Sequence, residues 1–408
     1  MVKISWSGVL KKKEICFISP MFFNCIGGME THAYEFIKVF AGDKEFPIKS
    51  ILVKKFDRDG IPVPNYEDRD DPGEANSVSK KIKKLTQRAL TGDFKEDAKK
   101  IMDTRDIENT VFFLNSPTWL PSFEIIKKKY PETKLILRSG GNDIVAGWIA
   151  NETNDRKSLE ESRSRVVEII NQYVDYCIVN SEYSAGRTKS AGVNENKIVK
   201  VIGGVDCSAF QPSKSAARLR ITILTTARLV KFKGFEYSIK AVKEVIKKRD
   251  LDVHYMIVGD GPERSTIERL SGGGLENRLS ILGAQRIEDM PEYYSKADIF
   301  LHLPIYLERH ERGSSYIHTE TMGRCLCEAS SSGLPIVSAR VGGVPEIVDD
   351  NDTGYLVPEK DYISASKKLL ELILNFDKRI EMGNKGRKKA GRYFDWKVVF
   401  EQYRKMFV

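Results

Sequence analysis

The amino-acid sequence predicts an α/β protein with two Rossmann-like domains, each a doubly wound parallel sheet, which face each other across a central cleft. Two observations indicate this fold class. Short apolar runs alternate with segments of helical periodicity, which is typical of parallel sheets covered by helices. Both halves of the 408-residue chain also begin alike, with an apolar strand, a turn that contains glycine and an amphipathic helix.

The apolar runs predict six strands in each half of the chain. They span residues 15–19, 48–53, 111–115, 134–138, 176–180, 198–202, 221–226, 253–259, 279–282, 299–303, 336–339 and 355–357. Helical periodicity follows the first strand of each half. It is carried by Ala33, Phe36, Ile37 and Phe40, and by Phe235, Ile239, Val242 and Ile246.

The boundary between the two domains is expected near residues 203–206. Residues 1–206 would form the first domain and residues 207–391 the second. The last segment, 392–408, is rich in aromatic residues, and we expect a helix that packs back on the first domain. Ligands of doubly wound sheets bind at the carboxyl ends of the strands, so the pocket is expected in the cleft between the domains.

The composition indicates an anionic partner, because 66 Lys and Arg face 57 Asp and Glu, for a net charge of +9. No motif of DNA- or RNA-binding proteins accompanies this charge, so we expect no nucleic acid. No apolar run approaches the ~20 residues of a membrane span. The run at 15–18 follows three lysines but is too short for a signal peptide, and we interpret it as a buried strand.

The six cysteines are scattered, which indicates reduced thiols and a cytoplasmic protein rather than a disulfide framework. Cys325 and Cys327 could bind a metal, but no His or Cys lies at the spacing of a zinc finger. We therefore interpret both as small core residues and expect no metal.

The most informative segment carries two carboxylates, Glu320 and Glu328, with Gly323 between them. Eight residues of helix span about 12 Å, so one carboxylate can precede a helix while the other lies on it, and both can face one pocket. Gly323 would let a ligand approach the free N–H groups of the helix start, where phosphate binds well. The pattern suits a diphosphate with hydroxyl groups at both ends, such as a nucleotide sugar. A helix cap and a surface glutamate are the alternative interpretation.

Arg228 and Lys233 follow the first strand of the second half, beside the next helix. Two cations at the carboxyl end of a strand could hold a diphosphate and neutralise its charge as it leaves. Solvated loop residues are the alternative.

These motifs together resemble the retaining nucleotide-sugar glycosyltransferases of family 4, the glycosyl transferases group 1. The similar segments keep the order and spacing of the family over nearly the whole chain from residue 15. They are 27–30, 180–182, 204–206, 228–234, 258–262, 297–300, 320–329, 333–337, 341–348 and 354–357. The resemblance implies the GT-B fold, a UDP- or GDP-sugar donor, and an acceptor hydroxyl on a glycan, a glycolipid or a lipid-linked sugar.

The resemblance also implies the roles of the charged residues. Arg228 and Lys233 would bind the donor diphosphate and stabilise the leaving group, Glu320 would contact the transferred sugar, and Glu328 would bind the ribose hydroxyls. The leaving phosphate oxygen would accept the proton of the acceptor, with the anomeric configuration retained. No cofactor and no metal would be needed, because cations and a helix N-terminus replace it.

Backbone groups complete the implied donor site. Gly323 would open the helix start, and the N–H groups of Arg324 and Cys325 would meet the phosphates. Gly259 and Asp260 belong to the similar segments and count as donor-side candidates, although Asp-Gly also favours tight turns. Asp260 is therefore interpreted as a turn former rather than a catalyst.

On the acceptor side, the resemblance implies that Gly27 and Gly28 line the cleft. His32 follows them by one helical turn and is a candidate for the same cleft. A packed or exposed histidine is the alternative for His32.

Two features depart from the family pattern. Many members carry a histidine after the fourth strand of the first domain, where this chain has Gly140, and Asn142 or Asp143 could contact the sugar or acceptor instead. Residues 305–319 also look inserted before Glu320. They could form a lid, an acceptor contact or an ordinary surface loop.

Segment 79–90 is basic and could form an amphipathic helix, either a solvated face or a contact with an anionic membrane. A nucleotide-sugar epimerase of the same fold and a non-catalytic nucleotide-sugar-binding partner subunit are the alternatives to a transferase.

Overall fold

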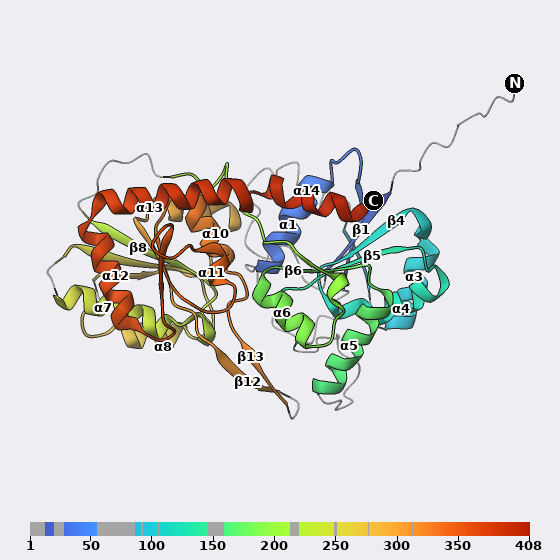
Figure 1. Ribbon diagram of the computed structural model, residues 1–408, viewed down its shortest axis with the longest axis horizontal. Coiled ribbons are helices and arrows are strands. Elements are labelled where there is room, and N and C mark those ends of the chain that lie inside the picture. The colour runs from blue at the N-terminus through green and yellow to red at the C-terminus, as the bar shows by residue number, and fades with distance from the viewer. Residues whose placement is uncertain are drawn as a thin grey trace, which may run out of the picture.

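The computed structural model contains two parallel sheets covered by helices, one in each domain, as the sequence predicts (Figure 1). The description covers residues 13–19, 28–54, 86–90, 93–104, 106–145, 159–212, 220–248, 251–275, 277–311 and 314–408. Helix α13 (Phe376–Lys389) and helix α14 (Trp396–Phe407) lie along one side of both domains and return the chain to the first domain.

The first domain is built on a seven-stranded sheet in the order β3-β2-β1-β4-β5-β6-β7, in which all neighbours are parallel. The strands are β1 (Glu14–Ser19), β2 (Ile48–Lys54), β3 (Thr86–Leu90), β4 (Thr110–Leu114), β5 (Lys134–Arg138), β6 (Tyr176–Val179) and β7 (Ile198–Lys200). Its helices are α1 (Gly28–Phe40), α3 (Phe94–Thr104), α4 (Leu120–Lys129), α5 (Leu159–Tyr173) and α6 (Glu182–Ser190).

The second domain has a six-stranded parallel sheet in the order β10-β9-β8-β11-β14-β15. Its strands are β8 (Ile221–Thr226), β9 (Val253–Val258), β10 (Leu279–Ile281), β11 (Ile299–His302), β14 (Ile336–Ala339) and β15 (Gly354–Val357). The helices before α13 are α7 (Phe235–Lys248), α8 (Arg264–Ser271), α9 (Met290–Ser295), α10 (Arg324–Ser331), α11 (Val344–Ile347) and α12 (Tyr362–Leu374).

All twelve predicted strands are present, and their ends lie within two residues of the prediction. The prediction of a basic helix at 79–90 is wrong for its second half, because Thr86–Leu90 forms the edge strand β3 beside β2. Residues 79–85 lie outside the described residues. The inserted segment contains an antiparallel hairpin of β12 (Leu307–Glu311) and β13 (Ser314–His318), in which Arg309 pairs with Tyr316.

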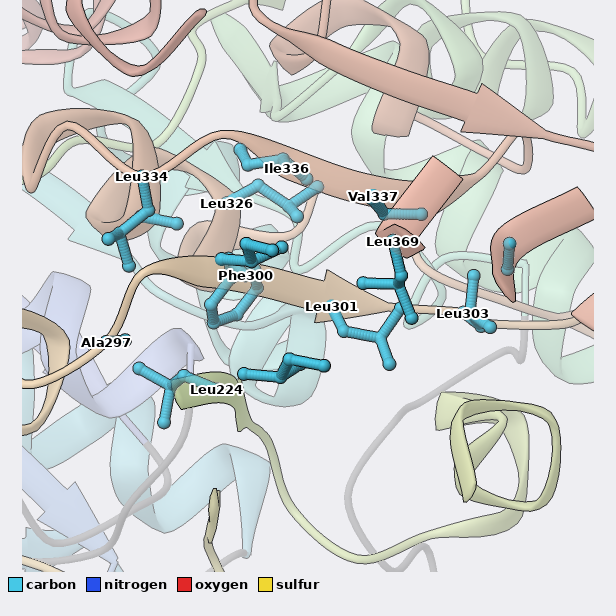
Figure 2. Close-up of a cluster of buried hydrophobic side chains, with 14 of the residues drawn as sticks. Leu224, Ala297, Phe300, Leu301, Leu303, Leu326, Leu334, Ile336, Val337 and Leu369 are labelled. Carbon is cyan, nitrogen blue, oxygen red and sulfur yellow. The ribbon is translucent and has the colours of Figure 1, made fainter. Parts of the chain in front are cut away.

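The central strands of each sheet are buried on both faces, which explains why they read as continuous apolar runs. In the second domain, side chains of β8, β11 and β14 meet those of α10 and α12 around Phe300 and Leu301, as Figure 2 shows. Among the described residues, no helix has both the length and the hydropathy needed to cross a bilayer.

Helix α14 packs against the first domain, although it follows the second domain in the chain. Its residues Trp396, Phe400 and Tyr403 join Phe36 of α1 and Phe113 of β4 in one buried cluster. Phe36 lies at the centre, with its ring centroid 4.5 Å from that of Phe113 and 5.9 Å from that of Tyr403. The contacts of α14 therefore tie the end of the chain to the first sheet, as the aromatic pattern of 392–408 predicts.

Candidate active site

Strands β8 and β11 end at the same edge of the second sheet, and the residues there form the core of the candidate site. Arg228 and Lys233 follow β8, while His302 ends β11. The two segments approach closely because Gly234 has a φ of 67°, and a Cβ there would lie 1.7 Å from the carbonyl oxygen of Leu303. Any side chain at position 234 would push the lysine loop away from β11.

Lys233, His302 and Glu320 form a buried group that we call the charged cluster. The Lys233 ammonium donates a hydrogen bond to Oε2 of Glu320, and His302 Nε2 lies 3.0 Å from the same oxygen. The side chains of Lys233 and Glu320 are only 15% and 11% exposed. Oε1 of Glu320 has no hydrogen-bond partner among the described residues, so it remains available to a hydroxyl group of a ligand.

The surroundings of Glu320 keep its carboxylate charged. Burial alone would raise its pKa, but the Lys233 charge and the His302 hydrogen bond together hold the pKa well below its usual range. Burial lowers the pKa of His302, which opposes a positive charge on the ring. Its Nδ1 has no partner among the described residues, so the geometry fits a neutral imidazole that donates through Nε2.

The second carboxylate of the motif, Glu328, is buried on helix α10. Arg324 Nε donates to its Oε1 at 3.1 Å, and the Tyr294 hydroxyl donates to its Oε2 at 2.7 Å. Each carboxylate oxygen can accept a second hydrogen bond. The carboxylate is therefore fixed in place by two donors and can still accept from the hydroxyl groups of a ligand.

The start of helix α10 lies between the two carboxylates. Gly323 has a φ of 88°, and a Cβ there would lie 2.8 Å from Leu326 and 3.5 Å from Cγ of Glu320. The first bond of the helix is donated by Leu326 to the Gly323 carbonyl, so the N–H groups of Arg324 and Cys325 precede it. N–H groups at a helix start, beside Lys233 and Glu320, suit an anion.

Arg228 and the loop after β9 lie at the outer side of this site. Arg228 is exposed and makes no ion pair with the described residues, so its charge is available to a ligand. Gly259 has a φ of 144°, and a Cβ there would lie 1.9 Å from the carbonyl oxygen of Ala227. The carboxylate of Asp260 accepts a hydrogen bond from the N–H of Gly261 at 2.7 Å, which is the behaviour of a turn former.

The first domain contacts the chain on both sides of Glu320. Asn142 Nδ2 donates to the Thr319 carbonyl at 3.4 Å, and Asn180 Nδ2 donates to Oγ1 of Thr321 at 3.2 Å. The loops that follow β5 and β6 therefore close over the charged cluster from the opposite side of the cleft.

The carboxylate of Asp143 is used by its own loop. It accepts hydrogen bonds from the Ser139 hydroxyl, from Gly140 N–H at 2.9 Å and from Ile144 N–H at 3.0 Å. Asp143 therefore shapes the loop at the position of the missing histidine, whereas Asn142 of the same loop reaches across the cleft.

His32 is buried between α1 and α14, with its Nε2 2.8 Å from the Tyr403 hydroxyl. Its ring also lies against Phe36 and Trp396. This is the packed alternative that the sequence left open. Gly27 lies outside the described residues, and Gly28 begins α1.

Glu346 joins the domains away from the charged cluster. Its Oε1 accepts from the N–H of Glu182 at 2.8 Å, at the first turn of α6, and its Oε2 lies 3.4 Å from Lys200 Nζ. A carboxylate at a helix N-terminus is stabilising. Glu346 is thus a contact between the domains.

Sequence reasoning missed His302 and Tyr294. His302 could have been found, because it is a polar residue at the carboxyl end of a predicted strand, where ligands bind. Tyr294 carries no comparable signal, since its role depends on the hydrogen bond to Glu328, 34 residues away in the chain.

Residues 210–389 match the family of glycosyl transferases group 1. The chain is 29% identical over 313 residues, which cover 74% of it and 76% of the relative, to a GDP-mannose-dependent monoacylated alpha-(1-6)-phosphatidylinositol monomannoside mannosyltransferase of Corynebacterium glutamicum. An uncharacterized glycosyltransferase of Methanocaldococcus jannaschii is 23% identical and covers 98% of this chain, with 99% of its own length.

Among solved structures, the chain is similar to Anabaena HepE in complex with UDP-glucose. The TM-score is 0.69 at 17% identity, over 96% of this chain and 98% of that chain. At this level of identity the similarity establishes the fold, two Rossmann-like domains facing each other as in GT-B proteins.

Proposed function

We propose that this chain, a group 1 glycosyltransferase with the GT-B fold, transfers a hexose from a UDP- or GDP-sugar to a hydroxyl group with retention of the anomeric configuration. The acceptor would be a glycan, a glycolipid or a lipid-linked sugar, in the synthesis of a polysaccharide or glycoconjugate. One observation carries the proposal. Glu320 of the charged cluster, the start of α10 and Glu328 follow one another along one short segment, in the order proposed for sugar, diphosphate and ribose.

The donor diphosphate would lie against the start of α10. Arg228 and Lys233 supply two positive charges there, and the N–H groups of Arg324 and Cys325 supply neutral donors. As the bond between the sugar and the phosphate breaks, negative charge grows on the leaving oxygen, and fixed cations stabilise that charge most. We therefore propose that the reaction needs no metal and no cofactor.

Glu320 would bind the transferred sugar rather than act as a strong base. A carboxylate with a lowered pKa is a weak proton acceptor, but it is a good acceptor of hydrogen bonds from sugar hydroxyl groups. We propose that the leaving phosphate oxygen takes the proton of the acceptor hydroxyl as the new glycosidic bond forms on the same face of the sugar.

The comparisons favour both nucleotide classes. One relative is described as GDP-mannose-dependent, and HepE is a complex with UDP-glucose. The acceptor named for the first relative is a glycolipid, which supports a lipid-linked acceptor here. We propose a cytoplasmic enzyme that binds the membrane surface peripherally. Sedimentation with vesicles that contain phosphatidylglycerol tests this, and no binding at low salt would reject it.

The donor site is tested by titrating the protein with UDP, GDP, UDP-sugars and GDP-sugars in the presence of EDTA. The readout is the thermal midpoint of unfolding. We expect one nucleotide class to raise the midpoint and Glu328→Ala and Arg228→Ala to weaken that effect. Glu268→Ala, on the exposed side of α8, is the matched control. No stabilisation by any donor, or equal stabilisation of all variants, would contradict the proposal.

A transfer assay then separates the enzyme classes. Release of the nucleoside diphosphate that depends on an added acceptor supports a transferase. Conversion of the donor without an acceptor would identify an epimerase, and tight donor binding without turnover would identify a non-catalytic subunit.

A further inference from the structure

The inserted β12–β13 hairpin forms one wall of a cavity of about 360 Å³ between the two domains. The opposite wall belongs to helices α5 and α6 of the first domain. Figure 1 shows the hairpin projecting from the second domain on the side where α5 and α6 lie. The cavity is open to solvent, and its volume is within the usual range of ligand sites, about 300–1,000 Å³.

Two arginines of the first domain line this cavity, Arg163 on α5 and Arg187 on α6. Arg187 donates to Oδ1 of Asn142 at 2.7 Å, and Arg163 Nε donates to the Val145 carbonyl at 2.9 Å. Each of these arginines thus donates to an uncharged oxygen atom. Among the residues that the structure describes, no carboxylate lines the cavity and neither arginine forms an ion pair. Two half-buried guanidinium groups thus line one cavity without a described carboxylate partner, which suits the binding of an anion.

Three tyrosines line the rest of the cavity. Tyr183 stands one turn from Arg187, with its ring under the guanidinium at 5.7 Å. Tyr306 faces it from the second domain, with 6.3 Å between the ring centroids, and Tyr316 comes from strand β13. Tyrosine rings offer flat apolar faces together with polar hydroxyl groups, which suits the C–H face and the hydroxyl groups of a sugar.

The cavity is connected to the charged cluster through short contacts. Arg187 binds Asn142, and Asn142 donates to the Thr319 carbonyl, which directly precedes Glu320. From the same hairpin, the His318 ring lies 4.4 Å from the ring of Phe232, the residue before Lys233. A molecule in the cavity would therefore lie beside the position proposed for the transferred sugar, on the acceptor side.

We propose that this cavity is an acceptor subsite, which rests on the proposed transferase function, and that it binds a sugar that carries a phosphate. Two guanidinium groups match the charge of a phosphate better than that of a single carboxylate, and each can donate two hydrogen bonds in parallel. The tyrosines hold the sugar ring. The hairpin is then a substrate-binding insertion that belongs to the active site.

The experiment measures binding of mannose 6-phosphate, mannose and inorganic phosphate by calorimetry, with UDP or GDP present to fill the donor site. We expect mannose 6-phosphate to bind at least tenfold more tightly than the other two ligands. Arg187→Gln should weaken its binding about tenfold or more. Arg165→Gln, which lies on α5 but outside the cavity, should leave its affinity unchanged.

A second variant tests the hairpin wall without disturbing the fold. Ser315 lines the cavity and is exposed, so Ser315→Asp would place a negative charge beside the phosphate, while Ser315→Asn has the same size without the charge. We expect only the aspartate to weaken binding, by about tenfold. Equal effects of both substitutions, or none, would overturn the proposal.

Other outcomes separate this inference from the proposed function. Nucleotide binding without mannose 6-phosphate binding would overturn the subsite and leave the donor site intact, whereas absence of both would overturn both. Equal affinity for mannose and its phosphate would overturn the anionic acceptor. Vesicles of phosphatidylcholine with and without phosphatidylinositol identify the source. Binding to phosphatidylinositol that Arg187→Gln abolishes supports a lipid-linked sugar phosphate. Binding of mannose 6-phosphate without binding to phosphatidylinositol supports a free sugar phosphate.

Discussion

The two domains each contain a buried histidine, and the two differ in what they contact. His32 of the first domain lies among aromatic rings, with its Nε2 2.8 Å from the Tyr403 hydroxyl. His302 of the second domain lies in the charged cluster, with its Nε2 3.0 Å from Glu320. Burial lowers the pKa of both. The two residues are therefore of the same type and equally buried, and they differ only in the hydrogen-bond partner. His32 packs against Tyr403, whereas His302 positions the carboxylate of Glu320, which faces the cleft.

The largest effect is expected when the charged cluster loses its cation. Lys233→Ala would remove the positive charge that lies beside the proposed leaving group. It would also leave Glu320 buried without its ion pair. We expect kcat to fall about 100–1,000-fold and the free energy of unfolding to fall by about 3 kcal/mol. Lys231→Ala changes an exposed lysine of the same turn and should do neither. Similar kinetics and stability for the two variants would show that the cluster is unimportant.

The next effect is expected at His302. His302→Leu would remove one of the two donors to Glu320, and we expect kcat to fall about tenfold with little change in KM, because one hydrogen bond to a charged group is lost. His302→Gln, whose amide can donate to the same oxygen, should restore most of the activity. Equal losses in the leucine and glutamine variants would contradict a positioning role and indicate a general packing defect.

The comparison also shows what the sequence can reveal. The central strands could be predicted because they are buried on both faces. Gly234 and Gly323 could be recognised because they have a positive φ, which other residues rarely adopt. The pair of carboxylates could be predicted because both lie on one short segment. The partners of His32 and His302 could not be predicted, because they are distant in the chain. Tyr403 lies 371 positions from His32, and Glu320 lies 18 positions from His302.

One local prediction failed for a similar reason. Segment 79–90 has a basic helical pattern, but its last five residues, Thr86–Leu90, pair with β2 at the edge of the first sheet. Tertiary pairing overrides a local pattern at such an edge. For residues 305–319 the sequence left a lid, an acceptor contact and a surface loop open, because the first-domain helices that the β12–β13 hairpin faces are distant in the chain.

A moderate effect on stability, with no effect on chemistry, is expected at His32. His32→Leu would leave the buried Tyr403 hydroxyl without this partner, and we expect the free energy of unfolding to fall by about 1–3 kcal/mol. The kcat and the nucleotide affinity should not change, since the ring is covered by α14. Denaturant unfolding and steady-state kinetics measure both quantities. A loss of activity without a loss of stability would contradict the packing role and indicate that His32 acts in the cleft.

The smallest effect is a difference in how stability depends on pH. The pKa of His32 is lowered in the folded protein, so below the ordinary value of about 6.5 the unfolded chain binds more protons at this residue than the folded chain does. Stability must then fall as the pH drops through this range, by up to about 1.4 kcal/mol per pH unit for each such histidine. In His32→Gln, which keeps an amide beside Tyr403, we expect a shallower fall between pH 7 and pH 5.5.

His302 should contribute in the same direction, so the slope should decrease but not vanish in His32→Gln. Glu320 acts in a lower range, because its pKa is lowered and its stabilisation is lost only as the pH falls below the ordinary value of about 4.3. His310→Gln, on the exposed outer part of the hairpin, is the control and should keep the slope of the parent protein. An unchanged slope in His32→Gln would mean that the His32 pKa is not lowered, and the two histidines would then differ in burial as well as in partner.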